Sequence, residues 1–132
     1  MWGDALALLA GHDYGWCDGG CQIAAVAIHD WIRASGHDAS LAVVLRPYLQ
    51  GIVQHFVVAV PAPAGPYYID ADGIRQRRAL LRQMRTRERL HGAMVEPYDP
   101  VRHQALTIPS DPAISSQLAD LLMTTLGPYQ PR

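Results

Sequence analysis

The spacing of apolar residues changes along the chain between a helical period and the short runs typical of strands. Apolar residues recur at intervals of three and four in several stretches, which predicts helices over residues 4–12, 21–36, 74–92 and 112–126. The second of these is apolar on most sides, so we expect it to be central and well buried.

Cap residues support the predicted ends of two of these helices. Gly36 follows the apolar row of the second helix, and glycine is the usual residue just past a helix C-terminus. Asp111 and Pro112 form an N-cap and first-turn pair ahead of the last helix, which therefore begins at Pro112.

Runs of β-branched and aliphatic residues predict strands over residues 40–45, 53–60, 67–73 and, for a short one, 93–98. The turn-forming run "PAPAGP" separates the second strand from the third, so this part of the chain is expected to form a hairpin. Mixed helices and strands without repeats or linkers predict an α+β fold, with a single domain over residues 1–132.

Composition narrows the functional classes. Apolar residues make up 49% of the chain and the formal net charge is −1, which does not suit a general nucleic-acid binder. No apolar run approaches the length of a membrane span, and the start "MWGDALALLAG" is acidic where a secretion signal is basic. We therefore expect a cytoplasmic protein in the producing cell.

Every basic side chain apart from histidine is arginine, and lysine is absent. A GC-rich coding sequence, as in many bacteria, is one explanation. The other is delivery into a host cell, where a protein without lysine escapes lysine modification.

The two cysteines, Cys17 and Cys21, flank a glycine pair immediately before the second predicted helix. A thiol attacks a carbonyl group only as thiolate, and a helix N-terminus favours the thiolate through its dipole and unpaired N–H groups. Cys21 stands at that helix start, whereas Cys17 precedes it. We therefore predict Cys21 as a nucleophile, with Gly20 allowing a substrate backbone to approach closely.

A nucleophilic cysteine needs a base, and the base needs an orienting group. His55 lies near the start of one predicted strand and Asp70 near the end of the next, so hairpin pairing brings them to one end with an offset of two residues. Asp72 is the rival carboxylate, but it is expected to cap the following helix. Each residue alone is more often structural, and only their order and spacing together indicate a site.

The segments "GGCQIAAVAI", "HFVVAV" and "YYIDADG" resemble, in that order, the papain-like superfamily of thiol enzymes. The layout is most similar to its transglutaminase-like, arylamine N-acetyltransferase and bacterial glutamine deamidase branch, and bacteriocin-processing peptidases are also similar. The resemblance implies a helix bearing Cys21, packed on a small antiparallel sheet with His55 and Asp70.

The same resemblance implies hydrolysis or transfer of an amide or acyl group on a protein or peptide substrate, through an acyl-enzyme and without a metal or cofactor. The papain signature itself is not met, since Gln22 follows Cys21 and no glutamine precedes it. The expected oxyanion donors are therefore the Gly20 backbone and the Gln22 side chain.

Two alternatives remain open at this stage. One is a papain-like protein-binding module without catalysis. The other is a metal-binding domain that uses His12, Cys17, Cys21 and His29. Without a metal, the histidines at 29, 37, 91 and 103 are predicted to lie on the surface.

The helix predicted over residues 74–92 is strongly basic. It holds seven of the eleven basic residues and one glutamate, the basic ones being Arg75, Arg77, Arg78, Arg82, Arg85, Arg87 and Arg89. A solvated face is one interpretation. The other is a docking surface for an acidic protein partner, with Arg78, Arg82 and Arg85 as its contacts; nucleic acid is not expected because no aromatic residues interleave.

Overall fold

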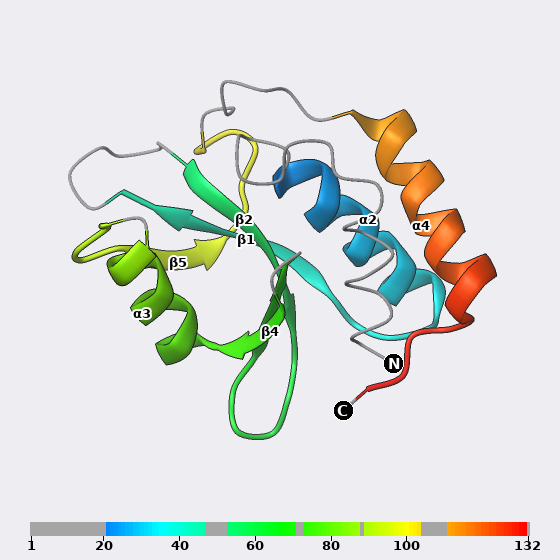
Figure 1. Cartoon of the computed structure of the whole chain (residues 1–132), viewed down its shortest axis with the longest axis horizontal. Helices are drawn as coiled ribbons and strands as arrows, with labels where there is room; N and C mark the ends of the chain where they lie inside the picture. Colours follow the sequence, from blue (N-terminus) through cyan, green and yellow to red (C-terminus); the bar gives the residue numbers. More distant parts are fainter. Residues whose placement is uncertain (1–20, 47–52, 71–72, 88, 104–110, 132) are drawn as a thin grey trace.

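The computed structural model describes residues 21–46, 53–70, 73–87, 89–103 and 111–131, with the backbone alone for Cys21. These segments form an α+β fold in which helices cover both faces of one sheet (Figure 1). No helix in these segments is long and apolar enough to cross a membrane.

The sheet has five strands in the order β4-β3-β2-β1-β5, and every neighbouring pair is antiparallel. The strands are β1 (Ser40–Leu45), β2 (Val53–Val60), β3 (Tyr67–Asp70), β4 (Gly73–Gln76) and β5 (Met94–Pro97). The predicted strands over 40–45 and 53–60 are confirmed, and so is the short one near residue 95.

The structure describes three helices: α2 (Cys21–Ala34), α3 (Arg77–Arg87) and α4 (Pro112–Leu126). Of these, α2 and α3 pack on the sheet, and α4 packs against α2. Figure 1 shows α2 and α4 side by side on one side of the sheet and α3 on the other. Each side has its own apolar core, because strand residues alternate between the two faces.

The larger core holds α2 firmly in place. Trp31 of α2 is buried in this core. Its indole N–H donates to the Gly127 carbonyl at 2.9 Å, and its ring meets the Tyr129 ring edge-on, with 5.6 Å between the ring centroids. At the other end of α2, the Ser115 hydroxyl of α4 donates to the Ile23 carbonyl at 3.0 Å. The first turn of α2 is thereby linked to α4.

The cap predictions are confirmed. Gly36 follows α2 with φ of 84°, a conformation that favours glycine. Asp111 accepts a hydrogen bond from the Ile114 N–H at 3.1 Å, with Pro112 in the first turn of α4. The helix predicted over residues 4–12 lies outside the described residues.

The helix predicted over residues 74–92 is wrong at both ends. Gly73–Gln76 form β4, which pairs with β3 through a two-residue connection, and α3 runs only from Arg77 to Arg87. Pairing in the hairpin overrides the local helical preference of this arginine-rich stretch. Asp72 therefore does not adjoin a helix start, and the prediction that it caps one is wrong.

Candidate active site

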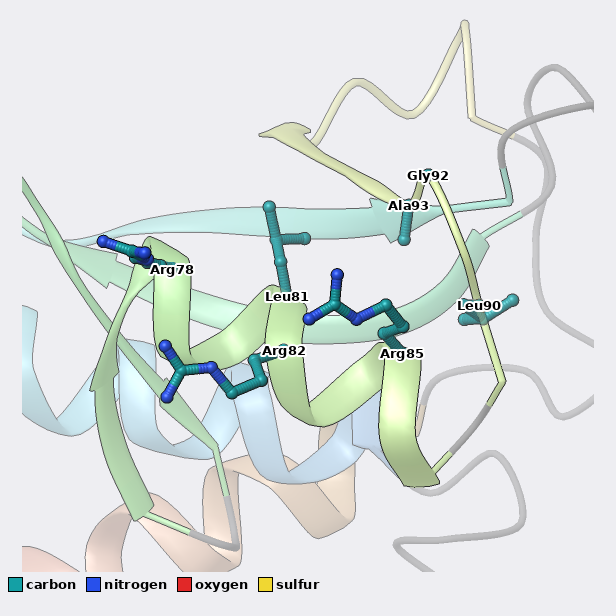
Figure 2. Close-up of a pocket in the computed structure, with 7 residues that line it drawn as sticks. All are labelled: Arg78, Leu81, Arg82, Arg85, Leu90, Gly92 and Ala93. Carbon is teal, nitrogen blue, oxygen red and sulfur yellow. The ribbon is translucent and has the colours of Figure 1, made fainter.

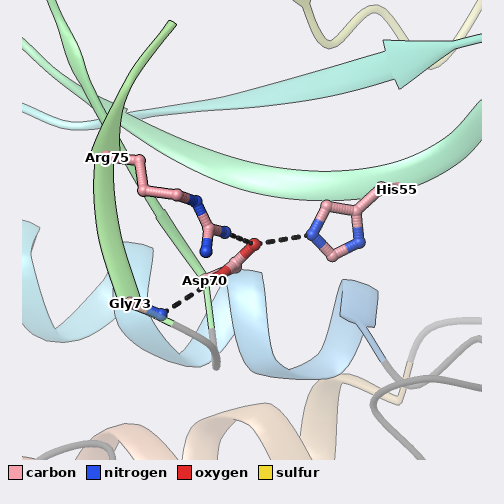
Figure 3. A network of polar contacts seen from close by, with 4 residues as sticks. All are labelled: His55, Asp70, Gly73 and Arg75. Atoms are coloured by element: carbon pink, nitrogen blue, oxygen red, sulfur yellow. Dashed lines mark hydrogen bonds and ion pairs between the residues drawn. The ribbon is translucent and has the colours of Figure 1, made fainter. Parts of the chain in front are cut away.

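His55 and Asp70 meet at one end of the β2–β3 hairpin. The His55 Nε2 atom lies 2.8 Å from Asp70 Oδ2 (Figure 3). The register pairs Val58 with Ile69, so Asp70 comes level with Val57, and His55 lies two residues further along β2. The offset of two that the sequence predicts is therefore the one observed, and diagonal neighbours of this kind are within side-chain reach.

An irregularity in β2 helps to aim the histidine. His55 pairs with Val44, yet Val53 pairs with the next residue, Leu45, so β2 carries one extra residue, Gln54. Such a bulge bends the strand and re-aims the neighbouring side chain. His55 keeps 19% of its side-chain surface exposed, which leaves the ring accessible at the edge of the core.

The Asp70 carboxylate is nearly buried, with 5% of its side chain exposed. Besides His55, it accepts a hydrogen bond from the Gly73 N–H at 3.2 Å and pairs with Arg75 Nη2 at 2.5 Å (Figure 3). A carboxylate removed from water needs such partners, because an uncompensated buried charge is strongly destabilising.

Arg75 is the residue of this site that sequence reasoning missed. The sequence pattern predicts a helical position for Arg75, but it lies on β4 opposite Tyr68, with 16% of its side chain exposed. Its Nε is buried and has no hydrogen-bond partner among the described residues. The available signal was the spacing from Asp70 to Gly73, which suits a tight hairpin and would have placed Arg75 on the returning strand.

The cluster formed by His55, Asp70 and Arg75 lies on one face of the sheet, at the end of β3. Arg75 is paired with Tyr68, and Asp70 follows Tyr68 by two residues, so these side chains share a face. Tyr68 and Val44, the partner of His55, both belong to the smaller core beside α3. α2 packs on the opposite face of the sheet (Figure 1).

Cys21 is the first residue of α2, as the sequence predicts, but its side chain is not described. Gln22 follows it and is half-buried, and Gly20 and Cys17 lie outside the described residues. Ile23 shares the larger core with Val53, two residues before His55. α2 packs against β2 through this core.

The described residues contain no group of three or more histidine, cysteine or acidic side chains that could hold a metal ion. Of the alternative metal set, His12 and Cys17 lie outside these residues. Cys21 and His29 occupy the two ends of a two-turn stretch of α2.

The surface prediction for His103 is wrong. Its side chain is 1% exposed, Nε2 lies 2.6 Å from Glu96 Oε1, and Nδ1 accepts a hydrogen bond from the Asp99 N–H at 2.9 Å. His103 therefore links the segment that follows β5 back to Glu96 of that strand. His91 is exposed, whereas His29 and His37 are partly buried.

Comparisons with protein-family models, curated proteins and solved structures found no match for this chain.

Proposed function

We propose that this protein is a thiol enzyme that hydrolyses or transfers an amide or acyl group, with Cys21 as nucleophile, His55 as base and Asp70 as the residue that orients the base. The observation that carries the proposal is the hydrogen bond between His55 and Asp70. It joins the two residues that the order of the chain singles out.

The hydrogen bond between His55 and Asp70 favours one tautomer of the imidazole. An ionised carboxylate only accepts hydrogen bonds, so Asp70 favours the neutral ring with its proton on Nε2. Nδ1 then holds the lone pair that would take the proton of the Cys21 thiol. Gly73 and Arg75 hold the carboxylate in place, which gives the ring a fixed orientation.

The position of Cys21 supports its role as nucleophile. It is the first residue of a helix of 14 residues, where the helix dipole and unpaired N–H groups favour a thiolate. The same N–H groups suit the negative oxygen that develops on the substrate. Gly20 and Gln22 are the proposed further donors.

The reaction follows from these roles. The Cys21 sulfur attacks the carbonyl carbon while its proton passes to His55. His55 then protonates the leaving amine, the C–N bond breaks, and a thioester remains on Cys21. Water or a second amine, deprotonated by His55, attacks the thioester and releases the acid or the new amide together with the thiol.

The packing of α2 on the sheet also supports a papain-like core. In this arrangement α2 packs against β2, which carries His55, and the next strand, β3, carries Asp70. Substrate is proposed to be a protein or peptide. The role of Cys21 requires neither metal nor cofactor.

A non-catalytic binding module is the second candidate, and one observation favours it. Asp70 binds Gly73 and Arg75 as well as His55, so the carboxylate also fastens β4 to β3. Such contacts between two strands stabilise the sheet, and this role does not require catalysis.

Selective alkylation separates the two candidates. Intact protein is treated with iodoacetamide at pH 6, where an ordinary thiol with a pKa near 8.5 is almost entirely protonated. We expect rapid labelling of Cys21 and slow labelling of Cys17, mapped by peptide mass spectrometry. Equal labelling of the two, or faster labelling of Cys17, supports the binding module instead.

A further inference from the structure

A basic pocket lies between α3 and the segment that follows it, away from His55 and Asp70. Its volume is about 330 Å³, and its lining residues are Arg78, Leu81, Arg82, Arg85, Leu90, Gly92 and Ala93. Figure 2 shows the three arginines along α3, with Leu90, Gly92 and Ala93 forming the opposite wall.

The chain builds this pocket by turning back sharply after α3. Arg89 adopts a φ of 55°, which is uncommon outside glycine, and Gly92 follows with 76°. The Leu90 N–H returns to the Met84 carbonyl at 3.1 Å, and the Leu90 side chain is buried in the smaller core. The segment 90–93 therefore runs back beside the helix as a wall.

The arginines of the pocket are exposed, and none forms an ion pair with any acidic side chain that the structure describes. Arg75 and Arg33, in contrast, each bind an aspartate. Three guanidinium groups around a half-buried leucine, Leu81, form a surface that is complementary to carboxylates flanking an apolar side chain.

We propose that this pocket binds an acidic peptide segment in extended conformation. Arg78 and Arg85 are seven residues apart on one helix, about 10 Å along its axis. A peptide in the extended polyproline II conformation covers about 9 Å in three residues, at roughly 3.1 Å each, and its side chains three residues apart lie on the same face. The preferred ligand therefore carries two acidic residues in the pattern Glu-x-x-Glu, with an apolar residue between them for Leu81.

Nucleic acid fits this pocket less well. No aromatic side chain lines it, so bases have no surface on which to stack. The chain as a whole has a net charge of −1, which does not favour a polyanion.

The binding test uses a fluorescein-labelled peptide containing Glu-Leu-x-Glu, titrated with the full chain carrying Cys21→Ala and followed by fluorescence anisotropy. That background separates this proposal from the thiol chemistry, because binding here does not require the nucleophile. We expect Arg82→Gln to weaken binding about fivefold. Arg87→Gln is the matched control, since Arg87 is an exposed arginine of the same helix outside the pocket.

Two further ligands complete the design: the same peptide with glutamine in place of both glutamates, and a short thymidine oligonucleotide. Loss of binding for the glutamine peptide, together with a larger effect of Arg82→Gln than of Arg87→Gln, supports the proposal. Absence of peptide binding, equal effects of the two substitutions, or tighter binding of the oligonucleotide would overturn it.

Discussion

The Nε2 atom of His55 lies 2.8 Å from Oδ2 of Asp70, across fifteen positions of sequence. The contact depends on the register of β2 against β3 and on the extra residue in β2 that aims the ring. It ties the proposed base to a carboxylate that is itself held by two further bonds.

Replacement of Asp70 by asparagine tests the orientation of the base. The amide favours the wrong imidazole tautomer, so we expect Cys21 alkylation at pH 6 to slow at least about tenfold. Asp72→Asn is the comparison, because Asp72 is the rival carboxylate in the sequence. If Asp72→Asn slows labelling while Asp70→Asn does not, the assignment of Asp70 is wrong.

Substitution of Arg75 tests whether Asp70 needs its cation. Arg75→Gln leaves a nearly buried carboxylate with one charged partner fewer, so we expect the free energy of unfolding to fall by about 1–3 kcal/mol. Arg75→Lys, which keeps the charge, should cost less. Urea denaturation measures both.

The control for Arg75 is Arg33→Gln, which removes an exposed pair with Asp38 at 3.4 Å and should change the unfolding free energy by less than about 0.5 kcal/mol. Equal losses for Arg33→Gln and Arg75→Gln would show that Arg75 does not support the buried carboxylate.

The conformation of Gly73 gives a third prediction. Its φ of 147° is strained for any residue with a side chain, while a Cβ added there meets nothing within 4 Å. Gly73→Ala should therefore destabilise by about 1–3 kcal/mol through the backbone alone. Gly73→Ser should cost the same in thermal or urea unfolding, and a much larger loss for serine would point to a steric clash instead.

His103 gives a fourth prediction, concerning stability only. His103→Ala removes the partner of Glu96 and of the Asp99 N–H in a buried place, so we expect a loss of about 2–4 kcal/mol in unfolding free energy. His91→Ala, at an exposed position, should have almost no effect. Similar stabilities of the two variants would contradict the structural role of His103.

The sequence predicts those parts of the molecule that local signals determine. The strands around residues 43 and 57, α2, and the Asp111 cap of α4 follow from periodicity and cap residues. The His55–Asp70 contact was also predictable, because a hairpin register depends on few residues.

The missed features depend on strand pairing and side-chain contacts that periodicity and propensity do not indicate. The stretch after Gly73 has strong helix formers, and only its pairing with β3 makes it a strand, so local propensity predicts the wrong element for Arg75. His103 is likewise buried because its ring binds Glu96 of β5 and the Asp99 N–H, contacts that no periodic pattern around His103 indicates.

The position of the Cys21 thiol relative to the His55 ring tests the central claim most directly. A crystal structure of the protein, grown under reducing conditions, measures the distance from Cys21 Sγ to His55 Nδ1. The proposed triad predicts a separation of about 4 Å or less. A Cys21 side chain directed into the core between α2 and the sheet, beyond reach of the imidazole, would contradict it.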